Sequence, residues 1–289
     1  MYVYYKMDDV AFSGLGFKEL ILDKMCPNPA IVAIGMRGSG KSSIVKALLQ
    51  SMKDYPVCYI ISMSEKFSPF FSNIVPDCFI WYKFESNIIK KLLLRQKEII
   101  KLKEEKKKEG KFIDSRVVIV MDDCLADAKN WKTDPHILEL MLNGRHYNIS
   151  FILTMQDPIG VGPLIRNNMD YAFILASDSY LNRKKIFENY CSCLPDRASF
   201  ERVFSELTSN YCSLVVINRG ERKDITDKIA WYKAPDLKNV KFTIGCSQYK
   251  NYHKYNYNEK WDEEKQKVSY EEYLAEQKKN KEKIKITKI

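Results

Sequence analysis

The chain has 289 residues, of which 45% are hydrophobic and 12% are aromatic. That much apolar side chain can offset the chain entropy lost on folding, which excludes a largely disordered protein and leaves room for one large domain with appendages. Lysine and arginine outnumber aspartate and glutamate by 47 to 37, and the net charge of +10 favours a polyanionic partner without identifying it.

Short apolar runs alternate with longer amphipathic stretches along the chain. The runs are AIVAI (30–34), VCYII (57–61), VVIVM (117–121), SFILT (150–154), YAFILA (171–176) and SLVVI (213–217). Apolar residues at three- and four-residue spacing predict helices over Ser42–Met52, Asn87–Glu109, Pro135–Arg145 and Leu181–Tyr190. This alternation is typical of buried parallel strands joined by helical crossovers, so we expect an α/β fold with helices on both faces of a sheet.

A glycine-rich loop directly follows the first apolar run and directly precedes a predicted helix. Residues 35–42 read GMRGSGKS and fit G-x-x-x-x-G-K-[ST] in the strand-to-helix context that this pattern requires. We expect Lys41 to bridge the β- and γ-phosphates of ATP and the Ser42 hydroxyl to ligate Mg²⁺, since a bare turn would leave both residues unexplained. The expected nucleotide-binding residues are Gly35, Met36, Arg37, Gly38, Ser39, Gly40, Lys41, Ser42 and Ser43.

The predicted helix over 87–109 continues into the charged stretch RQKEIIKLKEEKKKEGK (95–111). Its composition favours a solvated helix end, and a contact with DNA is the alternative.

The run VVIVMDD supplies carboxylates at the end of the third apolar strand. Asp122 is expected to be the Mg²⁺ partner through a bound water, and Asp123 to accept a proton from the attacking water or to orient it. An acidic strand-to-loop turn would be the alternative if the P-loop were absent.

Three further positions are expected to serve the same site. Thr154 and Gln156 end the strand SFILTMQ and should project from the carboxyl edge of the sheet, where a glutamine can contact both the γ-phosphate and the water. Arg145 ends the helix before that strand and is expected to neutralise charge on the ATP of an adjacent subunit. Arg37 and Arg166 compete for this role, and a surface role for Arg145 stays open.

The last part of the chain differs from this body. From about Gln248 the sequence becomes rich in tyrosine and asparagine and then strongly charged, so we divide the chain into a motor domain (1–246) and a helical C-terminal arm (247–289). The eight cysteines include no C-x-x-C pair and are expected to be free thiols in a reducing, intracellular compartment. We expect neither a signal peptide nor a membrane span.

With these segments in view, the sequence resembles the DNA-packaging ATPases of nucleocytoplasmic large DNA viruses, the poxvirus-type virion packaging ATPase among them. These proteins form a viral branch of the FtsK–HerA superfamily of P-loop NTPases. The resemblance covers roughly residues 15–235 and is most specific over 143–175, where NGRHYNI, TMQDP and IRNNMDY follow one another.

The resemblance implies a RecA-like, mainly parallel sheet of the additional-strand class and assembly into a homo-oligomeric ring of five or six subunits. It implies ATP-driven, sequence-tolerant translocation of double-stranded DNA into a capsid, capsid or portal-membrane proteins as partners, and a location in the virion and the viral factory of the host cytoplasm.

Individual positions carry the resemblance as well. Lys41 and Ser42 match the Walker A positions, and Asp122 matches the metal-binding aspartate of Walker B. Gln156 matches the sensor glutamine, and Arg145 lies where relatives have an arginine proposed to reach the neighbouring ATP. Asp123 falls where cellular relatives usually carry a glutamate, which leaves its water-activating role open.

A DNA pump of another FtsK–HerA type is one alternative to genome packaging, and two functions of other classes remain as well. A small-molecule kinase would also bind MgATP, but it needs an acceptor pocket and an arginine-bearing lid that the sequence does not show clearly. A non-catalytic, nucleotide-gated DNA-binding protein is suggested by Asp123 alone. A turnover assay with and without duplex DNA separates the DNA pump from the kinase and from the non-catalytic protein.

Overall fold

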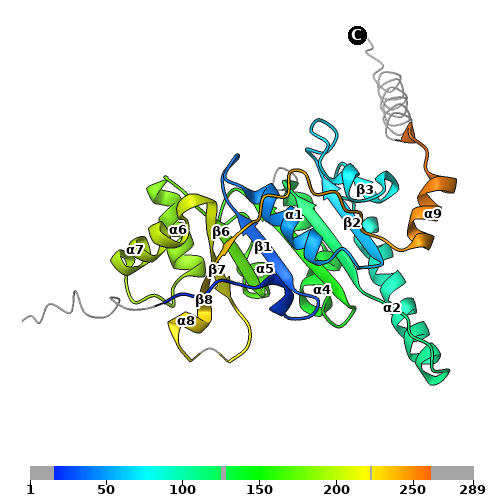
Figure 1. Cartoon of the computed structure of the whole chain (residues 1–289), viewed down its shortest axis with the longest axis horizontal. Coiled ribbons are helices and arrows are strands. Elements are labelled where there is room, and N and C mark those ends of the chain that lie inside the picture. Colours follow the sequence, from blue (N-terminus) through cyan, green and yellow to red (C-terminus); the bar gives the residue numbers. More distant parts are fainter. Residues whose placement is uncertain (1–15, 125–127, 222, 262–289) are drawn as a thin grey trace, which may run out of the picture.

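The computed structural model describes residues 16–124, 128–221 and 223–261, and these form one α/β body (Figure 1). Eight strands make a single sheet in the order β3-β2-β4-β5-β1-β6-β7-β8. They are β1 (Ala30–Ile34), β2 (Val57–Ser62), β3 (Ile80–Trp81), β4 (Val117–Asp122), β5 (Ile149–Met155), β6 (Tyr171–Leu175), β7 (Cys212–Ile217) and β8 (Ile229–Lys233). The α-helices are α1 (Lys41–Ser51), α2 (Ser86–Lys108), α3 (Ala128–Trp131), α4 (Pro135–Asn143), α5 (Pro163–Asn167), α6 (Tyr180–Tyr190), α7 (Arg197–Leu207), α8 (Ile225–Lys228) and α9 (Ser247–Asn256).

The six strands from β3 to β6 are mutually parallel. Every residue of β5 is buried. In β1 and in β4, all residues but one are buried, and the remaining one is partly buried. Such continuous apolar runs are expected where helices cover both faces of a sheet. The predicted α/β fold with a mainly parallel sheet is therefore confirmed.

The direction of the crossovers decides which helices share a face. The connection β1–α1–β2 runs along the sheet in one direction, whereas β3–α2–β4 and β4–α4–β5 run in the other. Because parallel crossovers are right-handed, α1 lies on one face and α2 and α4 lie together on the opposite face. Direct packing of α2 against α4 agrees with this assignment.

One part of the sequence interpretation was wrong, because the run at 213–217 does not form a parallel strand. β7 pairs antiparallel with β6, with Ser213 opposite Leu175, and β8 pairs antiparallel with β7. Two helices, α6 and α7, separate β6 from β7, and the chain re-enters the sheet at the edge where β6 ended. A single crossover helix would have returned it to the other edge.

After β8 the chain crosses the molecule to reach the opposite end of the sheet (Figure 1). The crossing segment, residues 234–246, is held by a hydrogen bond from Lys46 Nζ in α1 to the Leu237 carbonyl at 2.6 Å. Its end is fixed by the Ile244 amide, which donates to the Ile74 carbonyl, and by the Cys246 amide, which donates to the Pro56 carbonyl, both at 2.9 Å. This crossing brings α9 against the β2–β3 side of the sheet.

The C-terminal half of α2 extends away from the body (Figure 1). Most of its side chains there are exposed, and Lys106 pairs with Glu109 at 2.8 Å across the helix end. Lysines in the last turn also complement the helix dipole. These features agree with a solvated helix end.

Within the described ranges, no helix is both long and apolar enough to cross a membrane. All eight cysteines are free thiols.

Candidate nucleotide site

The P-loop connects the carboxyl end of β1 to the amino end of α1. Gly40 caps α1 with φ at +108°, a backbone conformation that L side chains rarely adopt, and no side chain caps the helix. The first N–H groups of α1 are therefore left facing the loop, and the positive end of the helix dipole points the same way. This geometry is an anion-binding arrangement of backbone alone.

Gly35 is required by close packing. A Cβ atom at this position would lie 2.4 Å from Ser39 Oγ and 2.9 Å from Leu175 Cδ1 at the end of β6. The Gly35 amide donates to the Met155 carbonyl at 3.1 Å. The start of the loop is thus seated between the ends of β5 and β6 and leaves no room for a side chain.

The Lys41 side chain folds back over the loop. Its Nζ donates to the carbonyl oxygens of Gly35 at 2.5 Å and Met36 at 2.8 Å. Burial lowers the pKa of Lys41, while the nearby carboxylates of Asp123 and Asp122 act in the opposite direction. The ammonium group of Lys41 therefore lies close enough to Asp122 and Asp123, at the end of β4, to interact with both carboxylates.

Asp122 is the last residue of β4 and is held by two hydroxyl groups. Thr154 Oγ1 donates to Asp122 Oδ1 at 2.8 Å, and Ser62 Oγ donates to Asp122 Oδ2 at 3.2 Å. Ser62 and Thr154 are 0% and 1% exposed. Burial raises the pKa of Asp122, and the two hydroxyl donors oppose this shift because they favour the ionised form. The carboxylate is thus fixed in orientation by the two strands that flank β4.

Asp123 turns away from the strand with φ at +52°, in the left-handed region. Its amide donates to Thr154 Oγ1 at 3.0 Å, and its carboxylate Oδ1 accepts from Gln156 Nε2 at 3.0 Å. Thr154 is therefore a bridge that contacts both aspartates. The turn carries the Asp123 carboxylate into solvent beside Gln156, and both side chains are exposed.

Ser42 lies in the first turn of α1, is exposed, and forms no hydrogen bond through its hydroxyl within the part of the chain that the structure describes. A hydroxyl and a carboxylate are oxygen ligands of the kind that Mg²⁺ takes from proteins when phosphates and waters supply the rest. Among the described residues no group of three His, Cys, Asp or Glu side chains forms a metal cluster. The residues present fit an Mg²⁺ ion delivered with a nucleotide.

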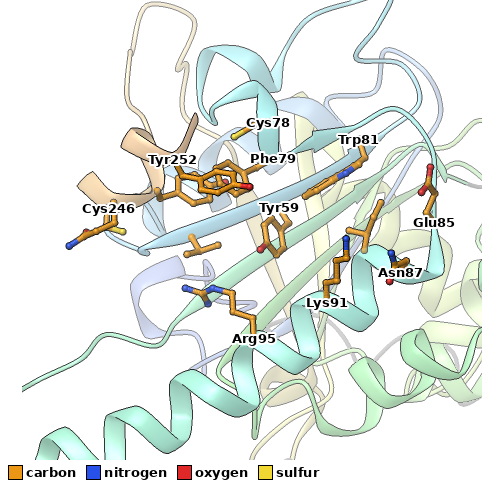
Figure 2. Close-up of a pocket in the computed structure, with 14 residues that line it drawn as sticks. Tyr59, Cys78, Phe79, Trp81, Glu85, Asn87, Lys91, Arg95, Cys246 and Tyr252 are labelled. Atoms are coloured by element: carbon orange, nitrogen blue, oxygen red, sulfur yellow. The ribbon is translucent and has the colours of Figure 1, made fainter. Parts of the chain in front are cut away.

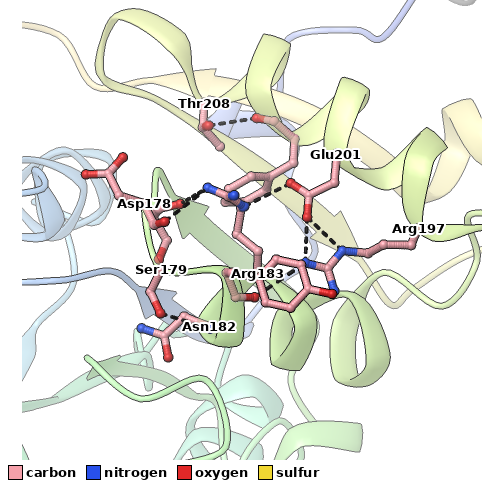
Figure 3. Close-up of polar contacts among 10 residues, drawn as sticks. Asp178, Ser179, Asn182, Arg183, Arg197, Glu201 and Thr208 are labelled. Atoms are coloured by element: carbon pink, nitrogen blue, oxygen red, sulfur yellow. Dashed lines mark hydrogen bonds and ion pairs between the residues drawn. The ribbon is translucent and has the colours of Figure 1, made fainter.

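A network of ion pairs on α6 and α7 holds the segment that follows β6 (Figure 3). Arg183 donates to the Ser177 carbonyl at 2.9 Å and pairs with Glu201 at 2.9 Å. Arg197 pairs with the same carboxylate at 2.6 Å and lies over the Tyr180 ring at 4.7 Å from its centroid. Because Leu175 packs on the P-loop, this network fixes the chain directly after a residue that shapes the loop.

The three arginines considered for the neighbouring ATP lie in different places. Arg145 is exposed in the turn before β5, at the amino edge of the parallel strands, whereas the P-loop lies at their carboxyl edge. The seven residues of β5 span about 20 Å between these edges. Arg145 therefore does not meet Lys41 within one chain. Arg37 is exposed in the loop, and Arg166 is held by the Val161 carbonyl at 2.5 Å and by Asn189 at 2.9 Å.

The fold thus brings together Lys41, Asp122, Asp123, Thr154 and Gln156 and leaves Arg145 apart. Sequence reasoning missed Ser62, although a serine at the end of a buried apolar run is the same signal that identified Thr154. It also missed the ion pair between Arg183 of α6 and Glu201 of α7, which no local pattern indicates.

Comparison with known proteins gives matches over most of the chain. Residues 19–186 match the family model described as "Poxvirus A32 protein". Protein L437 of Acanthamoeba polyphaga mimivirus is 38% identical over 270 residues, which cover 93% of this chain and 94% of the mimivirus protein.

Two solved structures are also similar to this chain. The conjugation coupling protein TcpA of pCW3, in its monomer form with ATPγS, aligns with a TM-score of 0.51 and 18% identity over 72% of this chain and 60% of TcpA, which shows a shared fold. The genome packaging NTPase B204 of Sulfolobus turreted icosahedral virus 2, in complex with AMPPCP, aligns with a TM-score of 0.49 and 19% identity over 73% of this chain and 100% of that chain.

Proposed function

Because the chain belongs to the Poxvirus A32 protein family, we propose that it is an ATPase that drives double-stranded DNA into a viral capsid. One observation carries the proposal: the P-loop, the paired aspartates after β4 and Gln156 after β5 converge at the carboxyl edge of the sheet, where open α/β sheets bind their ligands.

Lys41 and the amino end of α1 would hold the phosphates. The ammonium group would exchange its bonds to the Gly35 and Met36 carbonyls for phosphate oxygens. An anionic ligand would offset the burial that lowers the pKa of Lys41, because a nearby negative charge favours the ammonium form.

Ser42 and Asp122 would hold Mg²⁺, which supplies charge neutralisation for the transferring phosphoryl group. Hydroxyl donors from β2 and β5 keep the Asp122 carboxylate in one orientation, so little reorganisation is needed when the ion arrives with the nucleotide.

Asp123 and Gln156 would position the attacking water. Their side chains are hydrogen-bonded to each other and exposed, so a water molecule that contacts both can be oriented by an amide and a carboxylate at once. The Asp123 carboxylate would accept the proton that the water loses. This arrangement supports hydrolysis better than transfer to a small-molecule acceptor.

Translocation requires a grip on DNA that tolerates every sequence. A net charge of +10 supports binding through backbone phosphates. We propose a homo-oligomeric ring of five or six subunits in which Arg145, at the amino edge of one sheet, reaches the ATP held by a neighbour. In this scheme residues 1–246 form the motor and α9 packs on it. The remainder of the C-terminal arm (257–289), which from residue 262 lies outside the described residues, would contact a neighbouring subunit. The protein would work in the viral factory and the virion.

The experiment compares ATP turnover of the wild-type chain and of Lys41→Ala, each with and without duplex DNA. Wild-type turnover is expected to rise with duplex DNA, and Lys41→Ala is expected to lose nearly all turnover while it keeps its thermal unfolding temperature, since Lys41 holds charge and packs no core. Lys46→Arg in the same helix, which keeps a cation for the Leu237 carbonyl, is the matched control. Full turnover by Lys41→Ala, or turnover that ignores DNA, would contradict the proposal.

A further inference from the structure

A cavity of about 550 Å³ lies at the β3 end of the sheet, between β2, β3, α2 and α9 (Figure 2). Its lining includes Tyr59, Phe79, Trp81, Lys91, Arg95 and Tyr252. No residue of the lining lies in the P-loop or in the segments that carry Asp122 and Gln156. The cavity is therefore separate from the site described above.

One wall of this cavity is aromatic. Tyr59 lies edge-on to Trp81, with ring centroids 5.3 Å apart, and is stacked with Phe79 at 5.8 Å. Tyr249 stacks on Phe79 and donates a hydrogen bond to the Cys58 carbonyl of β2. These contacts fix the wall in place, so the rings present a preformed stacking surface.

Two cations line the opposite side. Lys91 and Arg95 are four residues apart on α2, so they share one face of the helix, and Figure 2 shows both side chains rising from α2 into the space below the rings. Neither forms an ion pair within the described part of the chain. Arg95 donates to Gln96 Oε1, and the buried Gln96 amide in turn donates to the Ser115 and Tyr147 carbonyls, which anchors this part of α2.

An aromatic wall facing unpaired cations defines the chemistry of the ligand. A purely apolar ligand would leave Lys91 and Arg95 without an anionic partner, and a simple anion would leave the rings uncovered. A planar ring that carries a negative charge satisfies both, because the ring stacks and the anion pairs with the cations. Glu85, Asn87 and Gln248 on the same lining can hydrogen-bond the polar edge of such a ring.

We propose that this cavity binds a nucleotide unit, with the base against Tyr59, Trp81 and Tyr252 and the phosphate at Lys91 and Arg95. Bases stack on aromatic side chains irrespective of sequence, and a basic groove tracks the phosphates. The source is either a free mononucleotide or a nucleotide of an unpaired DNA strand, and both share this chemistry. A proline-rich peptide also fits aromatic grooves but offers nothing to the two cations.

The test uses the full chain and a 5′-phosphorylated, fluorescent oligodeoxythymidylate of about eight nucleotides, a length within the usual site size for single strands. Binding is followed by anisotropy with MgATPγS present, so that the P-loop is occupied. Removing both cations in Lys91→Ala/Arg95→Ala is expected to weaken binding about tenfold or more. The matched control, Lys90→Ala/Lys101→Ala, removes two exposed cations of the same helix that do not line the cavity and should bind within about twofold of wild type.

A second pair of variants tests the aromatic wall without touching the core. Tyr252 and Tyr255 are both exposed on α9, and of the two only Tyr252 lines this cavity. Tyr252→Ala is expected to weaken binding about fivefold or more, and Tyr255→Ala should leave it unchanged. Competition by thymidine 5′-monophosphate distinguishes a free mononucleotide from a DNA strand as the ligand. If the mononucleotide competes with the affinity of the oligonucleotide, the ligand is a free nucleotide. If it competes much more weakly, the ligand is an unpaired DNA strand.

The site is located by photocrosslinking with an oligonucleotide that carries iodouracil, followed by peptide mapping. Crosslinks are expected in the peptides that contain Tyr59, Trp81 or Tyr252. The proposal is overturned if crosslinks fall only in the P-loop peptide, or if the Lys91/Arg95 variant binds as tightly as wild type. It is also overturned if a proline-rich peptide occupies the cavity equally in both proteins while the oligonucleotide does not bind there.

Discussion

Thr154→Val tests whether a single buried hydroxyl organises Asp122 and Asp123, the proposed catalytic carboxylates. Thr154 is 1% exposed, and its Oγ1 donates to Asp122 at 2.8 Å and accepts from the Asp123 amide at 3.0 Å. Valine has nearly the same shape, so the substitution removes both hydrogen bonds without opening a cavity. Each bond has a separate energetic consequence.

The bond to Asp122 involves an ionised acceptor and is worth about 1.5–3 kcal/mol, and an unpaired amide at Asp123 costs about 1 kcal/mol because water reaches that exposed residue. Thr154→Val is therefore expected to lower the free energy of unfolding by about 3 kcal/mol. Thr154→Ser keeps the hydroxyl and loses one buried methyl, for a cost of about 1 kcal/mol. The two variants should thus differ by about 2 kcal/mol in urea unfolding at neutral pH.

Thr154→Val and Thr154→Ser should differ more in ATP turnover than in the free energy of unfolding. Without the bridge, Asp122 and Asp123 lose their fixed orientation, and misplaced catalytic groups cost about 100-fold in rate. ATP turnover of Thr154→Val is expected to fall by that order, while Thr154→Ser stays near wild type. Equal turnover of Thr154→Val and Thr154→Ser, measured on protein shown to be folded, would refute the reasoning.

Three further predictions concern the same site. Gly35→Ala is expected to abolish nucleotide binding, measured by calorimetry, because its Cβ would lie 2.4 Å from Ser39 Oγ, and retained binding would show that the loop can shift. Burial raises the pKa of Asp122 above its ordinary value of 3.8, so the native state binds this proton more tightly than the unfolded chain does. The free energy of unfolding should therefore decrease as the pH rises from about 3.8 through the raised pKa, where the buried carboxylate becomes ionised. Asp122→Asn should therefore flatten this decrease in urea titrations across acidic pH, and an unchanged profile would argue against the buried carboxylate. Arg145→Ala and Lys41→Ala proteins, each inactive alone, should recover part of their ATPase activity when mixed if the arginine acts on a neighbour, whereas mixed rings without activity would favour Arg37.

The arrangement of the candidate nucleotide site was largely predictable because its parts are local in sequence. A glycine-rich loop between a strand and a helix, and polar residues that end apolar runs, each identify a position at one edge of a parallel sheet before any packing is known. Parallel strands deliver their carboxyl ends to the same edge, so the expected approach of Asp122 and Gln156 to the P-loop follows from the strands alone.

The remaining features depend on which segments meet, and local patterns do not contain that information. An apolar run has the same composition whether it pairs parallel or antiparallel, so only the two-helix connection before β7 decided its direction. Likewise, nothing near residue 249 indicates that its ring stacks on Phe79, because the partners lie 170 positions apart and meet through the chain crossing from β8. The sequence by itself determined the chemistry of each element, and the tertiary structure decided the pairings between distant elements, since these depend on the burial of the whole sheet.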